Sequence, residues 1–173
     1  SQVLEGREAL NPFNFSQNLK MYVLKYKIMK YELEIEIKQP RKKVIELFDS
    51  TENLKEWQCE LESFEHVSGT PGQVGAVSHL VFLMGKRRME MEETITSKNL
   101  PDEYAMTYEA PGMWNLVENF FIVKDENTTI YKSVQTFKGG SFMMKSMLFL
   151  MPNAFKKQSL KYMNNFKEFS EKQ

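Results

Sequence analysis

The chain has 173 residues, of which 42% are hydrophobic and 27% are charged, a balance typical of one globular domain with a sizeable core. Its 23 Lys and Arg residues equal its 23 Asp and Glu residues, and the basic run Lys86–Arg88 is too short for a nucleic-acid footprint, so nucleic acid is not an expected partner. Cys59 is the only cysteine, which excludes an intramolecular disulfide and a cysteine-based zinc cluster.

No segment of the sequence predicts insertion into a membrane. The most apolar run, Met147–Met151, is far shorter than the about 20 residues needed to cross a bilayer. Near the N-terminus, no sustained apolar stretch is followed by a small-residue cleavage site. We therefore expect no stable membrane insertion and a cytoplasmic location.

The N-terminal part differs from the rest of the chain. Gly6, Pro12 and several asparagines interrupt residues 1–20, and no periodic apolar pattern is present there. A regular pattern begins at Met29. We expect residues 1–28 to be an extension or leader outside the core and residues 29–173 to form one domain.

The first regular segment predicts a strand followed by two short helices. Apolar and charged residues alternate from Tyr31 to Lys38, a period of two that indicates a strand with one solvated face. Pro40 ends this strand and suits the first turn of a helix, where its missing N–H is harmless. Short apolar patterns then predict helices over Val44–Phe48 and Thr51–Trp57.

Six more strands are predicted in the middle of the chain, each bounded by turn-forming Gly, Pro, Asn or Asp residues. The regular spacing of these turns indicates an antiparallel meander. The predicted strands are Leu61–Val67, Val77–Met84, Arg88–Ser97, Tyr104–Ala110, Trp114–Val123 and Thr128–Phe137.

The C-terminal segment Ser141–Lys172 predicts a long amphipathic helix rich in Met and Phe. Its apolar residues recur at spacings of three and four, which places them on one helical face. Pro152 interrupts the pattern, so a kink or a split into two helices is expected there. The element order predicts an α+β domain with this helix packed on one face of a curved sheet.

Seven short segments follow one another along the chain: Ile37–Pro40, Val44–Asp49, Leu54–Trp57, Gly69–Gly75, Glu90–Thr94, Leu100–Glu103 and Phe166–Phe169. In this order and spacing they resemble the SRPBCC superfamily, which includes START lipid-transfer domains, polyketide cyclases and aromatases, and pollen-allergen-like binders. The resemblance covers Met29–Glu171 and implies the helix-grip fold, a seven-stranded sheet that wraps around the last helix and encloses a cavity for hydrophobic or amphipathic small molecules. It implies no particular reaction, because members range from carriers to enzymes.

The glycine-rich segment Gly69–Gly75 has the form G-x-x-G-x-x-G but does not predict a nucleotide site. A dinucleotide fingerprint lies between a strand and a helix, whereas a strand is predicted after this segment. A loop between strands is the better interpretation, and no cofactor is expected. His66 and His79, the only histidines, form no metal-ligand spacing with each other or with carboxylates, so no metal site is expected either.

Three residues are candidates for acid–base chemistry inside a cavity. Glu93 shares a strand face with Met89, Met91 and Ile95, and if that face points inward, desolvation raises the pKa of its carboxyl group. A strand-end position or pairing with Lys or Arg is the alternative. The other two candidates are His79, which alternates with valines but for which a structural or exposed position is the favoured alternative, and Tyr131.

The expected ligand-binding residues are large apolar side chains together with one amide, Asn119, which with Tyr131 could orient a polar head group. Core packing, or ordinary cross-strand contact for Asn119, is the alternative for each. The full set is Trp57, Phe82, Met91, Tyr108, Trp114, Asn119, Phe121, Met144, Met147, Met151 and Phe155.

These observations favour a protein that binds or carries a lipid-like or polyketide-like small molecule. An enzyme of the cyclase, dehydratase or hydrolase type acting in the same cavity is the main alternative. A third interpretation, a protein–protein adaptor resembling the chaperone-activator branch of the superfamily, is not supported by any partner motif. The oligomeric state is not specified by the sequence.

Overall fold

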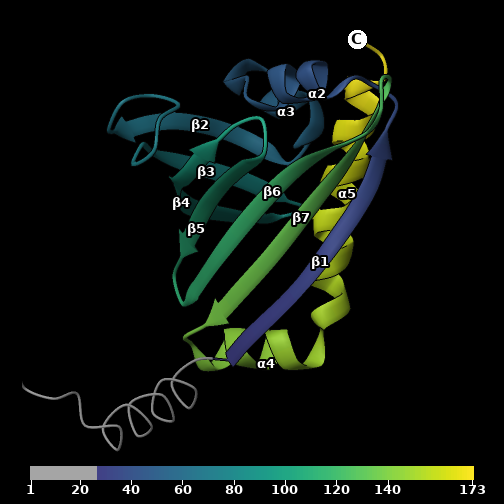
Figure 1. Ribbon diagram of the computed structural model, residues 1–173. Coiled ribbons are helices and arrows are strands. Elements are labelled where there is room, and N and C mark those ends of the chain that lie inside the picture. The colour runs from purple at the N-terminus through teal and green to yellow at the C-terminus, as the bar shows by residue number, and fades with distance from the viewer. Residues whose placement is uncertain (1–26) are drawn as a thin grey trace, which may run out of the picture.

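The computed structural model describes residues 27–173, which form one curved antiparallel sheet and its covering helices (Figure 1). Residues 1–26 lie outside the described part, so the expectation that they form an extension stays a prediction, whereas Lys27 and Ile28, expected in the same extension, belong to β1. The elements are β1 (Lys27–Ile37), α2 (Arg41–Phe48), the 3-10 helix Thr51–Asn53, α3 (Leu54–Trp57), β2 (Leu61–Ser68), β3 (Val77–Met84), β4 (Arg87–Asn99), β5 (Glu103–Ala110), β6 (Met113–Asp125), β7 (Thr128–Gly139), α4 (Phe142–Leu150) and α5 (Pro152–Ser170).

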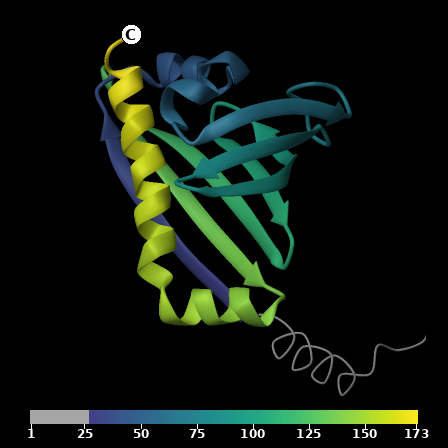
Figure 2. The ribbon, with the colours of Figure 1, turned by 180° about the vertical axis from the view of Figure 1, so that it is seen from behind.

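The seven strands have the order β1-β7-β6-β5-β4-β3-β2, so β2 to β7 form the expected meander and β1 is added beside β7. The sheet is strongly curved, and α5 crosses its concave side (Figure 2). α2 and α3 cover one end of the sheet and α4 lies across the other end (Figure 1). The predicted α+β architecture, with seven strands, two short helices after the first strand and a terminal helix, is confirmed.

The predicted terminal helix is split into two helices at Pro152, where a kink or a split was expected. Pro152 occupies the first position of α5, and Met151 between the helices has the non-helical backbone angles φ −129° and ψ 44°. At the other end of α4, the Ser141 hydroxyl caps the helix by accepting a hydrogen bond from the Met144 amide at 3.1 Å. As a result α4 runs across the end of the sheet while α5 runs along it (Figure 2).

The apolar core forms three clusters, one at each end of the sheet and a third on β2 and β3 made of Leu61, Leu80 and Phe82. At the α2–α3 end, the Phe48 ring lies 5.3 Å from the Phe166 ring and 5.1 Å from the Phe121 ring, which joins α2 to α5 and β6. At the α4 end, Tyr31, Phe137 and Leu148 form a second cluster. The space between these clusters, under α5, is where an internal cavity can remain.

Candidate ligand-binding cavity

A cavity of about 730 Å³ lies between α5 and the concave face of the sheet. It is lined by side chains from β2 to β7, from α4 and α5, and from the segment that contains α3. The volume is within the range of small-molecule binding sites, which extends from about 300 to 1,000 Å³.

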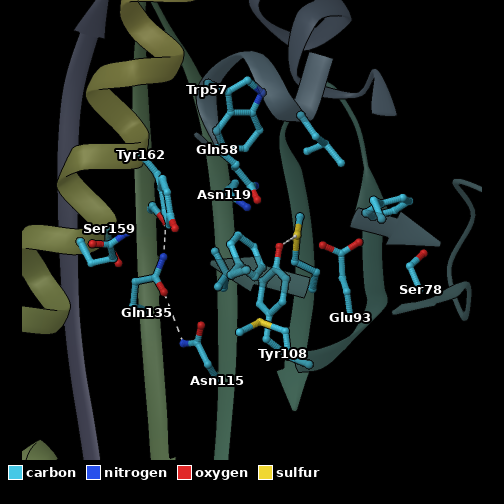
Figure 3. A pocket seen from close by; sticks show the side chains of 18 of the residues that line it. Trp57, Gln58, Ser78, Glu93, Tyr108, Asn115, Asn119, Gln135, Ser159 and Tyr162 are labelled. Carbon is cyan, nitrogen blue, oxygen red and sulfur yellow. Dashed lines mark hydrogen bonds between the residues drawn. The ribbon is translucent and has the colours of Figure 1, made fainter. Parts of the chain in front are cut away.

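Cross-strand register explains which side chains reach the cavity. Ser78, Glu93, Tyr108, Asn115 and Phe137 are direct neighbours across five adjacent strands. Because side chains alternate between the two faces of a strand, all five project from the same face of the sheet. All five line the cavity, and Figure 3 shows the four polar ones.

Methionines make up much of the apolar wall. Eight of the twelve methionines in the chain line the cavity. Because the methionine side chain is unbranched and polarizable, a wall of this kind adapts to apolar molecules of different shape. The eight are Met84, Met89, Met91, Met106, Met113, Met144, Met147 and Met163.

A ribbon of hydrogen-bonded polar side chains on β6 and β7 lies within the cavity lining. The Asn115 amide donates to Gln135 Oε1 at 3.3 Å, and the Gln135 amide donates to the Ser133 hydroxyl at 3.0 Å (Figure 3). Farther along, the Tyr131 hydroxyl donates to Asn119 Oδ1 at 2.8 Å. We call these five residues the polar ribbon. Its amides and hydroxyls are neutral groups that can exchange these bonds for bonds to a ligand.

The Asn119 side chain is held more firmly than the other amides of the polar ribbon. It is 1% exposed, and its amide nitrogen donates to the Tyr104 carbonyl at 3.1 Å on the neighbouring strand. Both ends of this amide are therefore occupied, one by Tyr104 and one by Tyr131. Burial raises the pKa of the Tyr131 hydroxyl above its ordinary value of 10, so Tyr131 is neutral near pH 7 and is placed to donate a proton in a hydrogen bond rather than to act as a base.

Glu93 lies in the cavity lining with an exposed fraction of 8%. Burial raises the pKa of its carboxyl group above the ordinary value of 4.5, and the neighbouring Tyr108 hydroxyl acts in the opposite direction. Burial and the negative charge of Glu93 raise the pKa of Tyr108 in turn. No Lys, Arg or His of the described residues forms an ion pair with Glu93, so the alternative of a buried ion pair does not describe this site.

His79 does not face the cavity, so the expectation that it could act there is wrong. Ser78 and Phe82 on β3 line the cavity, whereas His79 lies on the opposite face, with its Nε2 atom 3.4 Å from a Glu90 carboxylate oxygen. The flanking valines suggested an inward face. Val81, however, is buried on the same outer face as His79, because neighbouring side chains cover it there.

Three expected ligand-binding residues also lie elsewhere. The Trp114 ring is on the outer face of β6, where the Lys138 ammonium lies 3.8 Å from its centroid. The Phe121 side chain is 1% exposed and stacks on Tyr131 within the core, outside the cavity lining. Met151 occupies the junction of α4 and α5 and is 55% exposed. Its position follows from the helix break, which turns it away from the cavity.

The other expected residues line the cavity, although their role in binding stays a prediction. They come from α3, four strands and both C-terminal helices. They are Trp57, Phe82, Met91, Tyr108, Asn119, Met144, Met147 and Phe155, together with the candidate acid–base residues Glu93 and Tyr131.

Sequence reasoning did not select the polar part of the lining that Asn115, Ser133, Gln135 and Ser159 contribute. The alternation on β7 was visible, but polar residues occupy both of its faces, so polarity did not identify the inward one. Ser159 belongs to the apolar stripe of α5, and its hydroxyl lies 2.9 Å from the Tyr31 hydroxyl. A hydroxyl residue within an otherwise apolar stripe was the available signal for that position.

Charged groups are scarce in the lining. Arg87 is the one Lys or Arg among the described lining residues, and it lies beside the β3–β4 turn at the edge of the cavity. Within residues 27–173, no group of three or more His, Cys, Asp or Glu side chains is arranged to hold a metal ion. No helix in this part of the chain combines the length and apolarity needed to cross a membrane.

No family model matches this chain, and no curated protein matches it in sequence. Solved structures match it in fold. The allergen Ara h 8.0201 aligns with a TM-score of 0.69 and 14% identity, covering 85% of this chain and 100% of the allergen. The Zhui aromatase/cyclase from Streptomyces sp. R1128 aligns with a TM-score of 0.70 and 13% identity, covering 84% of this chain and 94% of the cyclase.

This chain has the helix-grip fold. Norcoclaurine synthase from Thalictrum flavum, solved with dopamine and hydroxybenzaldehyde, also aligns, with a TM-score of 0.65 and 13% identity over 98% of this chain and 95% of the synthase. The fold implied by the resemblance to SRPBCC proteins is therefore confirmed. Because helix-grip proteins at this level of identity share the fold alone, function has to be argued from the cavity.

Proposed function

We propose that this helix-grip protein binds a hydrophobic or amphipathic small molecule inside its cavity. The observation that carries the proposal is the internal space of about 730 Å³, which the chain keeps open between two apolar clusters. Protein interiors are normally close-packed, and a void of this size forfeits packing energy unless a ligand fills it. A filled cavity restores those contacts.

The lining favours an elongated molecule with one apolar side and a few neutral polar groups. Methionines contact the apolar part, and the polar ribbon offers amides and hydroxyls to hydroxyl or carbonyl groups of the ligand. A carboxylate is disfavoured, because Glu93 is the buried acidic group of the wall and Arg87, beside the β3–β4 turn, is the one Lys or Arg among the described lining residues. Neutral lipid-like and polyketide-like molecules fit this description.

A cavity-filling substitution tests the proposal directly. Ser133 is 1% exposed and lines the cavity, so Ser133→Phe places a ring inside it. Extraction and mass spectrometry of the purified protein would identify co-purifying apolar molecules, and titration with the neutral dye Nile red would measure binding. We expect the substitution to weaken dye binding by at least about tenfold, because the ring occupies ligand volume.

Lys132→Phe provides the matched control, because it adds the same ring one residue earlier, on the outer face of β7 where Lys132 pairs with Glu32. This variant should bind Nile red like the parent. Equal dye binding by a folded Ser133→Phe variant, or no extractable or bindable apolar molecule, would contradict the proposal.

An enzyme acting inside the cavity is the second candidate function, and Glu93 is the observation that favours it. A carboxyl group with a raised pKa beside a tyrosine hydroxyl is suited to donate or accept a proton during a cyclisation, dehydration or hydrolysis. Such a step needs the reacting atom within hydrogen-bond distance of the Glu93 carboxyl group, and the position of Glu93 in the cavity lining supports this candidate.

Chemical conversion of the extracted molecule separates this candidate from simple binding. An enzyme would convert it during incubation, and Glu93→Gln would abolish the conversion while leaving Nile red binding intact. Glu92→Gln is the control, because Glu92 is the adjacent, exposed residue on the outer face of β4. Unchanged conversion by Glu93→Gln would remove Glu93 as the acid–base group.

A further inference from the structure

Helix α4 exposes more apolar surface than a nine-residue helix of a globular protein normally does. Lys145 and Ser146 are its only polar residues. One side of the helix is used internally, because Leu148 is buried against the sheet and Met144 contributes to the cavity wall. We call its exposed apolar side chains the α4 patch: Phe142 at 88%, Met143 at 59%, Phe149 at 68% and Leu150 at 72% exposed, with Met151 just beyond the helix at 55%.

The α4 patch is a continuous surface rather than a set of scattered side chains. Phe142, Met143, Leu150 and Met151 border one shallow groove of about 300 Å³ along the helix. Contiguous exposed apolar surface of this kind marks an interaction site, whereas single exposed apolar residues are ordinary. A helix that is apolar on its outer face as well as on its core-facing side needs something to cover the outer face.

The charge around the α4 patch indicates what covers it. Residues 127–167, which include β7, α4 and most of α5, contain seven lysines and no acidic residue. Outside the patch, several of these lysines form ion pairs, such as Lys132 with Glu32 and Lys161 with Glu60. Among the described residues, no carboxylate lies within ion-pair distance of Lys145 in α4 or of Lys156 and Lys157, which follow the patch in α5.

We propose that the α4 patch docks on the surface of a membrane that contains anionic phospholipid. Exposed Phe, Leu and Met side chains enter the boundary between head groups and acyl chains, and flanking lysines pair with lipid phosphates and carboxylates. Two cations are already placed over rings near the patch, Lys27 at 5.4 Å from the Phe149 centroid and Lys156 at 5.8 Å from the Tyr31 centroid. α4 lies on the membrane and does not cross it.

Docking at this surface brings the cavity wall to the membrane. Met144 and Met147 of α4 line the cavity, while Phe149 and Leu150 of the same helix face outward. A shift of α4 toward the lipid would therefore open the cavity on the side where an apolar ligand is most soluble. The docking surface itself does not depend on whether the cavity belongs to a carrier or an enzyme.

Co-sedimentation of the full chain with vesicles tests the proposal without any cavity ligand. We expect binding to phosphatidylcholine vesicles that contain phosphatidylserine, weaker binding to phosphatidylcholine alone, and a loss of affinity as salt is added. The double variant Phe149→Ser/Leu150→Ser should lower the affinity by at least about tenfold, because it removes two apolar side chains that would be buried in the membrane. Lys156→Glu/Lys157→Glu should lower it by a similar factor through charge.

Val67→Ser/Val74→Ser is the matched control, because these valines are 56% and 59% exposed in and after β2, away from α4. This variant should bind vesicles like the parent. Absence of binding to phosphatidylserine vesicles, or undiminished binding by a folded Phe149→Ser/Leu150→Ser variant, would overturn the proposal. Because no cavity ligand is present, either result leaves the Nile red experiment unaffected.

A fluorescent label distinguishes a membrane from other occupants of the patch. In a Cys59→Ser background, Leu150→Cys is labelled with an environment-sensitive dye, and Val74→Cys serves as the control position. The emission of the label at residue 150 should be that of a dye in water for the free protein. It should shift to the blue when phosphatidylserine vesicles are added, because the label then enters an apolar environment. Blue-shifted emission before vesicles are added would overturn the proposal, since the patch would then be covered by residues 1–26 of the chain or by a second copy, which light scattering tells apart.

Discussion

Glu93 is the one charged side chain among the buried residues of the described part of the chain. Its titratable neighbours include Tyr104 and Tyr108, whose hydroxyls are neutral near pH 7 and whose pKa values burial raises further above 10. A carboxylate with no cationic partner is costly in such surroundings. The folded state therefore favours the protonated carboxylic acid.

We predict that Glu93→Gln changes stability in a pH-dependent way. Because the pKa of Glu93 is raised on folding, its contribution to stability is fully present below the unfolded value of 4.5 and is lost as the pH rises through the folded value. Each unit of elevation corresponds to about 1.4 kcal/mol. The Gln variant should match the parent near about pH 4 and be the more stable protein near about pH 8 in urea unfolding.

Glu92→Gln is the control for this measurement, because Glu92 is exposed on the outer face of the same strand. It should change stability by no more than about 0.5 kcal/mol at either pH. A Glu93→Gln variant that is less stable than the parent near neutral pH would show that the charged carboxylate is stabilised by the fold.

Individual lining residues differed in how well the sequence predicted them. The face of β4 that carries Glu93 was predictable, because methionines mark it as apolar. On β3 the same reasoning failed for His79, since Val81 is apolar and buried on the outer face. On β7 the inward face mixes polar and apolar residues: Ser133 and Gln135 line the open cavity beside Tyr131 and Phe137, so polarity does not mark the outer face.

At the level of elements, the β5–β6 turn supports the start of α4. Gly112 in this turn has a φ angle of +76°, a conformation that residues with a side chain rarely adopt. Its carbonyl accepts a hydrogen bond from the Gly140 amide at 2.9 Å, next to the residue that caps α4. A Cβ atom at Gly112 would lie 2.7 Å from the Cβ and Oγ atoms of Ser141.

We predict that Gly112→Ala destabilises the protein by about 2–3 kcal/mol, because backbone strain and a steric clash act together. Gly85→Ala separates the two effects. Gly85 has a φ angle of +66° in the β3–β4 turn, but no atom lies within 4 Å of the added Cβ. Gly85→Ala should therefore lower the free energy of unfolding by only about 1 kcal/mol, with both variants measured by urea unfolding. Equal costs for the two variants would show that Ser141 moves aside freely.

Element boundaries were largely predictable, but the directions of elements were not. Turn residues located the strands, and Pro152 located the break between α4 and α5. The angle at that break depends on the packing of Leu148 against Phe137 and against Tyr31, which is distant in sequence. Periodicity within the segment therefore indicated an apolar helix without showing that Phe149 and Leu150 would face solvent.

At the scale of the whole molecule, the open cavity couples stability to ligand binding. A ligand that binds only the folded chain stabilises it by about 2.7 kcal/mol at a free concentration of 100 times Kd. For a domain of this size that corresponds to an increase in Tm of about 5–10 °C. We predict such a shift with saturating Nile red for the parent and for Lys132→Phe, measured by circular dichroism.

The Ser133→Phe variant should show little or no shift in Tm with the dye, because its cavity is partly filled. A similar shift in all three proteins would show that the dye binds outside the cavity, with the α4 patch as an obvious alternative location. Repeating the measurement with Phe149→Ser/Leu150→Ser would identify that location.

The pairing of β1 with β7 has a consequence for how the chain folds. Lys27 pairs with Gly139 and Ile37 with Thr129, so the first described strand has its partner near the other end of the chain. During synthesis, β1 therefore stays unpaired until β7, the last strand of the meander, has been synthesised. Contacts between residues so far apart in sequence slow folding. A strand that stays unpaired during this time can associate with other chains and aggregate. The alternating glutamates of β1 keep one of its faces soluble during that interval.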